Sequence, residues 1–130
     1  MIQWKENYSI GVAAIDEQHQ KLFEIANRAY VLLKNGLLLD KYDQIIAIFE
    51  ELRTYTVYHF NSEEAYMASI QYRKLLSHKV YHDDFIEKVN SIDFDQVDEK
   101  QDQYLMDILN FVGKWIEEHI LGHDKRIVLG

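Results

Sequence analysis

An apolar repeat with steps of three and four residues runs through most of this chain, and no proline interrupts it. The 130 residues include five glycines and no proline, so long helices can form without a break. Side chains that are three and four residues apart lie on one face of an α-helix. The alternation that is typical of strands is missing. The repeat therefore predicts an all-α protein.

Four helices are expected from these repeats and from the residues that flank them. The first begins with Asp16 as its N-cap and ends near Gly36, because glycine is favoured just beyond a helix C-terminus. The other three are expected at about residues 40–68, 72–91 and 98–121. Long helices joined by short loops favour an up-down-up-down four-helix bundle. An irregular N-terminal arm precedes this bundle, and a short C-terminal tail follows it.

The composition is that of a soluble globular domain. Apolar residues make up 48% of the chain and charged residues 28%, and one core accounts for this length, so a single domain over residues 1–130 is expected. The net charge of −8 argues against nucleic acid or an anionic membrane as the main partner. No apolar run approaches the ~18 residues of a membrane span, and the N-terminus lacks a signal-peptide core, so we expect a cytoplasmic protein. The absence of cysteine excludes disulfides and thiolate metal sites.

Five of the six histidines lie where the apolar repeat calls for a hydrocarbon. A single histidine on such a face is usually a core residue with one satisfied hydrogen bond. Five of them, together with Glu63, would each cost about 1 to 3 kcal/mol without strong partners. A domain with a net stability of ~5 to 15 kcal/mol cannot carry that cost. The five are His19, His59, His78, His82 and His119.

These residues are expected to meet at one end of the bundle. In an up-down-up-down order, the start of the first and third helices lies beside the end of the second and fourth. At ~1.5 Å per residue, all of them fall within about 3 to 17 Å of that common end. Two pairs, His59 with Glu63 and His78 with His82, are four residues apart and share a helix face.

A second carboxylate, Asp124, follows His119 at a spacing of five. That spacing would rotate the carboxylate off the face of a continuing α-helix. We expect Gly122 to end the helix after Leu121 and to turn the chain back, which returns Asp124 to the site. The candidate ligands are then five imidazoles and two carboxylates.

Seven ligands exceed what one metal ion takes from a protein, and they suit two ions that both carboxylates bridge. Imidazole with carboxylate favours iron, manganese, copper, cobalt or zinc over calcium or magnesium. Five imidazoles divide into three on one ion and two on the other. The second ion then keeps an open position for a small ligand.

The ordered combination of His, His-x3-Glu, His-x3-His and His-x4-Asp resembles the hemerythrin family, specifically its single-domain bacterial form. The resemblance covers the whole chain and ends in "HILGHD". It begins with Trp4, Tyr8, Gly11, Ile15, Asp16, Gln18 and His19.

This resemblance implies reversible dioxygen binding at a non-haem di-iron centre with an oxo or hydroxo bridge. It also implies a division of the ligands between the two irons. His78, His82 and His119 would hold the saturated iron. His19 and His59 would hold the open iron, and Glu63 and Asp124 would bridge the two.

We expect apolar neighbours of the ligands to line the oxygen pocket, with Ile116 as a gate to it. For Leu22, a purely structural role in the core is an equally good interpretation. The pocket residues are Leu22, Phe60, Trp115, Ile116 and Ile120.

Two positions depart from the pattern or lack a role. Many relatives have a tyrosine three residues after the bridging aspartate, whereas this chain has Ile127. His123 has no role in the family, and we expect it to be exposed to solvent or to hydrogen-bond a ligand.

Several function classes stay open from the sequence. The first is an oxygen carrier, store or scavenger that is not an enzyme. The second is a di-iron peroxidase, oxidase or nitric-oxide reductase, although the chain has no Glu-x2-His pair like those of ferritin-like enzymes. The third is a sensor of oxygen, nitric oxide or iron, which would need a separate protein partner for its output. A dizinc hydrolase is the alternative on metal chemistry alone.

Overall fold

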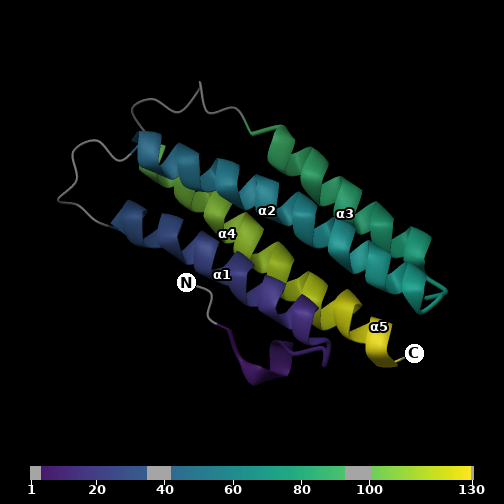
Figure 1. The fold of residues 1–130 in the computed structure, drawn as a ribbon. Helices are drawn as coiled ribbons and strands as arrows, with labels where there is room; N and C mark the ends of the chain where they lie inside the picture. Colours follow the sequence, from purple (N-terminus) through teal and green to yellow (C-terminus); the bar gives the residue numbers. More distant parts are fainter. Residues whose placement is uncertain (1–3, 35–41, 93–100, 130) are drawn as a thin grey trace.

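Four long helices run side by side and alternate in direction (Figure 1). The computed structural model describes residues 4–34, 42–92 and 101–129. In the described part of the chain every regular element is helical, which confirms the all-α prediction. The long helices are α1 (Ala13–Lys34), α2 (Tyr42–Ser69), α3 (Leu75–Asn90) and α4 (Gln101–His119).

The N-terminal arm is fixed to the beginning of α1. It contains a single 3-10 turn, η1 (Glu6–Tyr8). The prediction that Asp16 is the N-cap is wrong, because α1 begins three residues earlier and Asp16 lies in its first turn. The Asp16 carboxylate instead accepts hydrogen bonds from Ser9 Oγ at 2.6 Å and from the Ile10 amide at 2.8 Å. Asp16 thus ties the arm to the helix rather than capping it.

The remaining boundaries differ from the predictions at the ends. The third helix is shorter than expected at both ends, at Leu75–Asn90 instead of residues 72–91. The expected C-terminal tail is helical, because a π-helical turn, η3 (Ile120–Asp124), and a short helix, α5 (Lys125–Leu129), follow α4. The predicted end near Gly36 and the predicted starts of the second and fourth helices lie outside the described residues.

Apolar side chains from all four long helices fill the bundle. Helix α1 packs against α2 and α4, and α2 packs against α3. Several core side chains are no more than 2% exposed, among them Phe23, Ile25, Ile45, Phe85 and Leu105. No described helix combines the length and the apolar character that a membrane span requires. The end of the bundle that carries the polar site is where α2 turns into α3 and α4 runs into η3 (Figure 1).

Candidate metal centre

All seven predicted ligands lie together at one end of the bundle. Each long helix contributes ligands from the part nearest that end: α1 one histidine, α2 a histidine and a glutamate, α3 two histidines and α4 one histidine. The turn that follows α4, η3, contributes the aspartate. Each side chain is at most 4% exposed. The set comprises His19, His59, Glu63, His78, His82, His119 and Asp124.

The seven side chains form two overlapping groups that share both carboxylates. In the first group the ligand atoms of Glu63, Asp124 and three histidines all lie within 4.8 Å of one another. The second group joins the same two carboxylates to His19 and His59, under the same distance limit. A donor set with this division suits two ions better than one.

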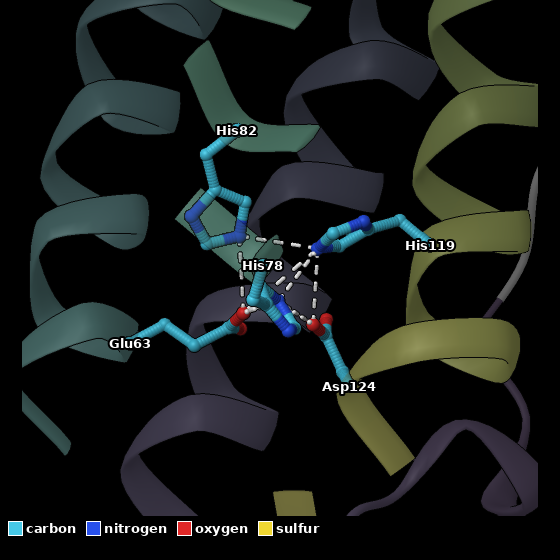
Figure 2. Close-up of side chains that lie close together, drawn as sticks. All are labelled: Glu63, His78, His82, His119 and Asp124. Atoms are coloured by element: carbon cyan, nitrogen blue, oxygen red, sulfur yellow. Dashed lines mark hydrogen bonds and ion pairs between the residues drawn. The ribbon is translucent and has the colours of Figure 1, made fainter. Parts of the chain in front are cut away.

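The three-histidine group converges on a single point between its rings. Figure 2 shows the imidazoles and both carboxylates directed toward one another. The Nε2 atom of His119 lies 2.9 Å from Nε2 of His78 and 3.1 Å from Nε2 of His82. Two ligand atoms at right angles around an ion, each about 2.1 Å from it, are about 3 Å apart. The spacing of these nitrogens therefore matches that of neighbouring ligands on one metal ion.

Each carboxylate presents one oxygen to each group. Glu63 Oε1 lies 2.8 Å from His78 Nε2, whereas Glu63 Oε2 lies 3.3 Å from His59 Nε2. Asp124 Oδ1 lies 2.9 Å from His78 Nε2, whereas Asp124 Oδ2 lies 3.1 Å from His19 Nε2. This is the arrangement that two bridging carboxylates require.

A π-helical turn brings Asp124 back to the site. In η3 the Lys125 amide donates to the Ile120 carbonyl, five residues earlier. A turn that is one residue wider than an α-turn places residues five apart on one face, and Asp124 Oδ1 lies 3.1 Å from His119 Nε2. The prediction that Gly122 breaks the helix is wrong. Gly122 lies inside η3 and does not have the positive φ of a chain reversal.

Several buried polar atoms at the centre lack hydrogen bonds, although nitrogens and oxygens lie close by. Among the described residues, neither oxygen of Asp124 has one, and nor do Glu63 Oε2 and His19 Nε2. The Asp124 oxygens lie 2.9 to 3.1 Å from histidine nitrogens, and Glu63 Oε2 lies 3.3 Å from His59 Nε2, without the geometry of a hydrogen bond. A buried polar atom without a partner is costly, and a cation among these atoms would satisfy all of them. The residues present therefore fit a pair of metal ions.

The electrostatics of the protein without metal also favour positive charge between the carboxylates. Burial alone would lower the pKa of His19 and of His78, but contacts with Asp124 and Glu63 raise both pKa values to about 9. Burial likewise opposes ionisation of Asp124, yet the surrounding histidines lower its pKa to about 2. Protons on the imidazoles thus take the place that cations would fill.

Two residues that the sequence analysis did not assign orient the ligand rings. The Nδ1–H of His59 donates to Gln18 Oε1 at 2.7 Å, and the Nδ1–H of His82 donates to Glu64 Oε2 at 3.0 Å. Such outer hydrogen bonds fix which nitrogen faces the metal. Gln18 lies next to a ligand histidine, and Glu64 follows Glu63. Their positions in the sequence were therefore a usable signal.

Aromatic rings pack against the other faces of two ligands. Phe60 stacks on His82 with ring centroids 3.8 Å apart and an angle of 2° between the planes. Trp115 stacks on His119 at 4.5 Å and 10°. These rings leave the two imidazoles little freedom to rotate.

A small cavity adjoins the two-histidine group. All five residues predicted to line the oxygen pocket line this cavity, which has a volume of about 10 Å³. Leu22 is among them and is also part of the core. Thr56 and Phe85 also line the cavity and were not predicted to. They lie three residues before His59 and three after His82, and this helical spacing identifies them as neighbours of ligands. A cavity of this size is close to the limit for one water-sized molecule.

The two unassigned positions near the C-terminus have clear environments. Ile127 is buried, at 4% exposed. His123 is half-buried and packs its ring against Tyr81, with centroids 4.1 Å apart. No hydrogen bond from His123 to a ligand occurs among the described residues, so it is neither fully exposed nor a hydrogen-bond partner.

Comparisons with known proteins agree with this arrangement. The family model described as "Hemerythrin HHE cation binding domain" matches residues 10–128. The chain is 48% identical to a bacteriohemerythrin of Clostridium acetobutylicum, with 98% of this chain and 99% of that protein covered. It is 28% identical to a bacteriohemerythrin of Pseudomonas paraeruginosa, over 93% of this chain and 75% of that protein. A hemerythrin-like protein of Naegleria gruberi is 27% identical, over 95% of this chain and 87% of that protein. With this match along nearly its whole length, the chain belongs to the hemerythrin family.

Proposed function

We propose that the chain holds two iron ions between its seven ligands. His78, His82 and His119 hold one ion, His19 and His59 hold the other, and the two carboxylates bridge them. The division of each carboxylate's oxygens between the two groups carries this proposal. The names of the relatives support iron rather than the other metals that suit these ligands. Purified protein should then contain two irons per chain.

We further propose that the centre binds dioxygen reversibly, so that the protein carries, stores or scavenges oxygen. When bound, the iron pair would supply electrons to dioxygen as it binds and would take them back as it leaves. The two-histidine ion has one imidazole fewer than its neighbour. Both of its histidines line the small apolar cavity, whereas His119 is the one lining histidine of the other group among the described residues. A cavity near the size of one water molecule is far too small for an organic substrate.

The lining of this cavity offers little for proton-coupled chemistry. Apart from the ligands, its polar groups among the described residues are the Thr56 hydroxyl and the Trp115 indole N–H, which is not an acid or base at ordinary pH. The Thr56 hydroxyl already donates to the Leu52 carbonyl at 2.7 Å, so its proton is directed away from the cavity. An oxidase or peroxidase needs a positioned acid or base to cleave the oxygen–oxygen bond. This lining therefore favours reversible binding over an enzymatic role.

The visible spectrum tests this proposal. Anaerobic, reduced, iron-loaded protein should develop a charge-transfer band when air is added and lose it when argon removes the oxygen. Immediate and irreversible oxidation with turnover of peroxide would instead support a di-iron enzyme. A spectrum that responds to nitric oxide but not to oxygen would support a sensor.

A further inference from the structure

A second cavity lies outside the metal centre, on the outer side of His78. It has a volume of about 270 Å³ and is formed where the start of α3 meets η3 and α5. Tyr81 and His123 make one wall, with ring centroids 4.1 Å apart. Lys74, Ser77, His78 and Arg126 are among the other lining residues.

The charge of this cavity is opposite to that of the protein. The chain carries a net charge of −8, yet the cavity is lined by Lys74 and Arg126 and by no carboxylate. Within the described ranges neither cation forms an ion pair, whereas Arg28 and Arg53 both pair with glutamates. Two unpaired cations in one concave site attract an anion.

The start of α3, which contributes Ser77 to the lining of the cavity, has backbone amides without an acceptor. The first turn contains no acidic residue, and the N-cap residue Lys74 makes no side-chain capping bond. The amides of Leu76 and Ser77 find no backbone acceptor in the residues before the helix. Free amides at a helix start bind anions, and the helix dipole strengthens that binding.

His78 supplies an independent sign that a ligand belongs in this cavity. The side chain is 4% exposed, and its Nε2 faces Glu63 and Asp124 in the metal centre. Its other ring nitrogen, Nδ1, has no protein partner in the described part of the chain, whereas His59 and His82 both have one. The Nδ1 of His19 also lacks a partner, but His78 differs from His19 in that its ring lines this cavity. An anion in the cavity would supply an acceptor for the His78 Nδ1–H.

We propose that this cavity binds one small tetrahedral oxyanion of the phosphate class. Lys74 and Arg126 contact its oxygens, and His78 Nδ1–H donates a hydrogen bond to it. The volume lies just below the range of about 300 to 1,000 Å³ that organic ligands usually occupy, which favours a free ion over a nucleotide. This site is separate from the oxygen cavity, and its existence does not depend on dioxygen binding.

Calorimetric titration of inorganic phosphate into the iron-loaded protein tests this site. We expect saturable binding of one phosphate per chain, with sulfate competing and chloride competing poorly. The double variant Lys74→Gln/Arg126→Gln should weaken binding about tenfold or more, the order expected for two charge-assisted contacts. The matched control Lys79→Gln/Lys114→Gln removes the same charge from exposed positions outside the cavity and should change affinity less than about twofold. All four positions are exposed, so both variants should fold.

Two outcomes would overturn the proposal. If phosphate does not bind saturably at millimolar concentration, or if the two double variants bind it equally, the cavity is not an anion site. Phosphate should also shift the exchangeable Nδ1–H resonance of His78 in the proton spectrum of the wild type. An unchanged resonance at saturating phosphate would contradict the contact with His78. Because calorimetry does not involve oxygen, a failed oxygen-binding experiment leaves this result interpretable.

Discussion

Gln18 lies behind a ligand of the two-histidine group rather than in the centre itself. Its amide oxygen accepts the Nδ1–H of His59, which fixes the tautomer that points Nε2 at the metal. Gln18→Leu should lower the affinity for iron about 10- to 100-fold, the usual loss when such a partner is removed. The measurement is the iron retained per chain after dialysis against a graded chelator. Gln18→Glu, which keeps an acceptor, should retain the iron.

The exposed Gln20 provides the matched control for that experiment. It lies two residues further along the same helix, on the solvent side, so Gln20→Leu should retain iron like the wild type. Equal iron loss in Gln18→Leu and Gln20→Leu would show that the hydrogen bond to His59 does not set affinity.

Ile116 is the residue through which the cavity can be enlarged most directly. It is 4% exposed and lines the cavity. Ile116→Ala should cost about 2 to 5 kcal/mol of unfolding free energy and should speed autoxidation several-fold, because water gains access to the open position. Leu109→Ala, in the same helix but away from this cavity, should lose similar stability without faster autoxidation. Equal autoxidation rates in the two variants would contradict the role of Ile116 as a gate.

The element on which the site depends most is the π-helical turn η3. Inserting one alanine after Leu121 would give a spacing of six between His119 and the bridging aspartate. Residues six apart share a face in neither an α-helix nor a π-helical turn, so the insertion would rotate that carboxylate out of the shared position. We expect the insertion variant to bind at most one iron per chain, as measured by metal analysis.

Gly122→Ala is the control for that insertion. An added Cβ at Gly122 meets no atom within 4 Å, and the backbone there is right-handed. The variant should therefore keep both irons and gain up to about 1 kcal/mol of stability from the lower entropy of the unfolded chain. Loss of iron in Gly122→Ala would return the glycine to the role of a chain reversal, which the sequence alone suggested.

The helices and the clustering of the candidate ligands were predictable because both follow one period. His59 with Glu63 and His78 with His82 continue apolar faces at steps of four, so the same rule locates the core and the site. The path to Asp124 was not predictable from that rule. A spacing of five is compatible with a broken helix or with a π-turn, and a glycine between the ligands favours the first when only sequence is considered.

The start of α1 was predicted wrongly for a different reason. Asp16 has the side chain of an N-cap, but its carboxylate binds Ser9 and the Ile10 amide in the arm. Such a long-range use of a capping residue is invisible to local propensity. Gln18 and Glu64 are adjacent in sequence to ligand residues, which marks them as candidates, but the hydrogen bonds that they accept depend on how the His59 and His82 rings are turned.

At the scale of the whole molecule, the proposed metal pair and protons on the imidazoles are alternative sources of positive charge in the core. In the chelated protein, from which a chelator has removed the metal, the pKa values of His19 and His78 are about 9, raised from 6.5. A raised pKa stabilises the fold fully below pH 6.5, and that stabilisation is lost as pH rises through about 9. The chelated protein should therefore unfold at lower urea concentration at pH 9.5 than at pH 6.

The iron-loaded protein should depend less on pH over the same interval. Metal ions replace the protons on the ligand nitrogens, and they add stability because they bind the folded chain alone. Urea unfolding of both forms at the two pH values makes the comparison. A chelated protein whose stability rises between pH 6 and 9.5 would contradict the paired imidazole and carboxylate charges.

Oxygen uptake by the reduced iron-loaded protein is the most direct test of the function. A sealed oxygen electrode records the dioxygen taken up per chain, and lowering the oxygen pressure records how much returns. A pair of irons in which one iron has an open position should take up one dioxygen per chain. It should release nearly all of that dioxygen over repeated cycles, without free peroxide. Continuous consumption of oxygen, or uptake that does not return when the pressure falls, would contradict reversible binding.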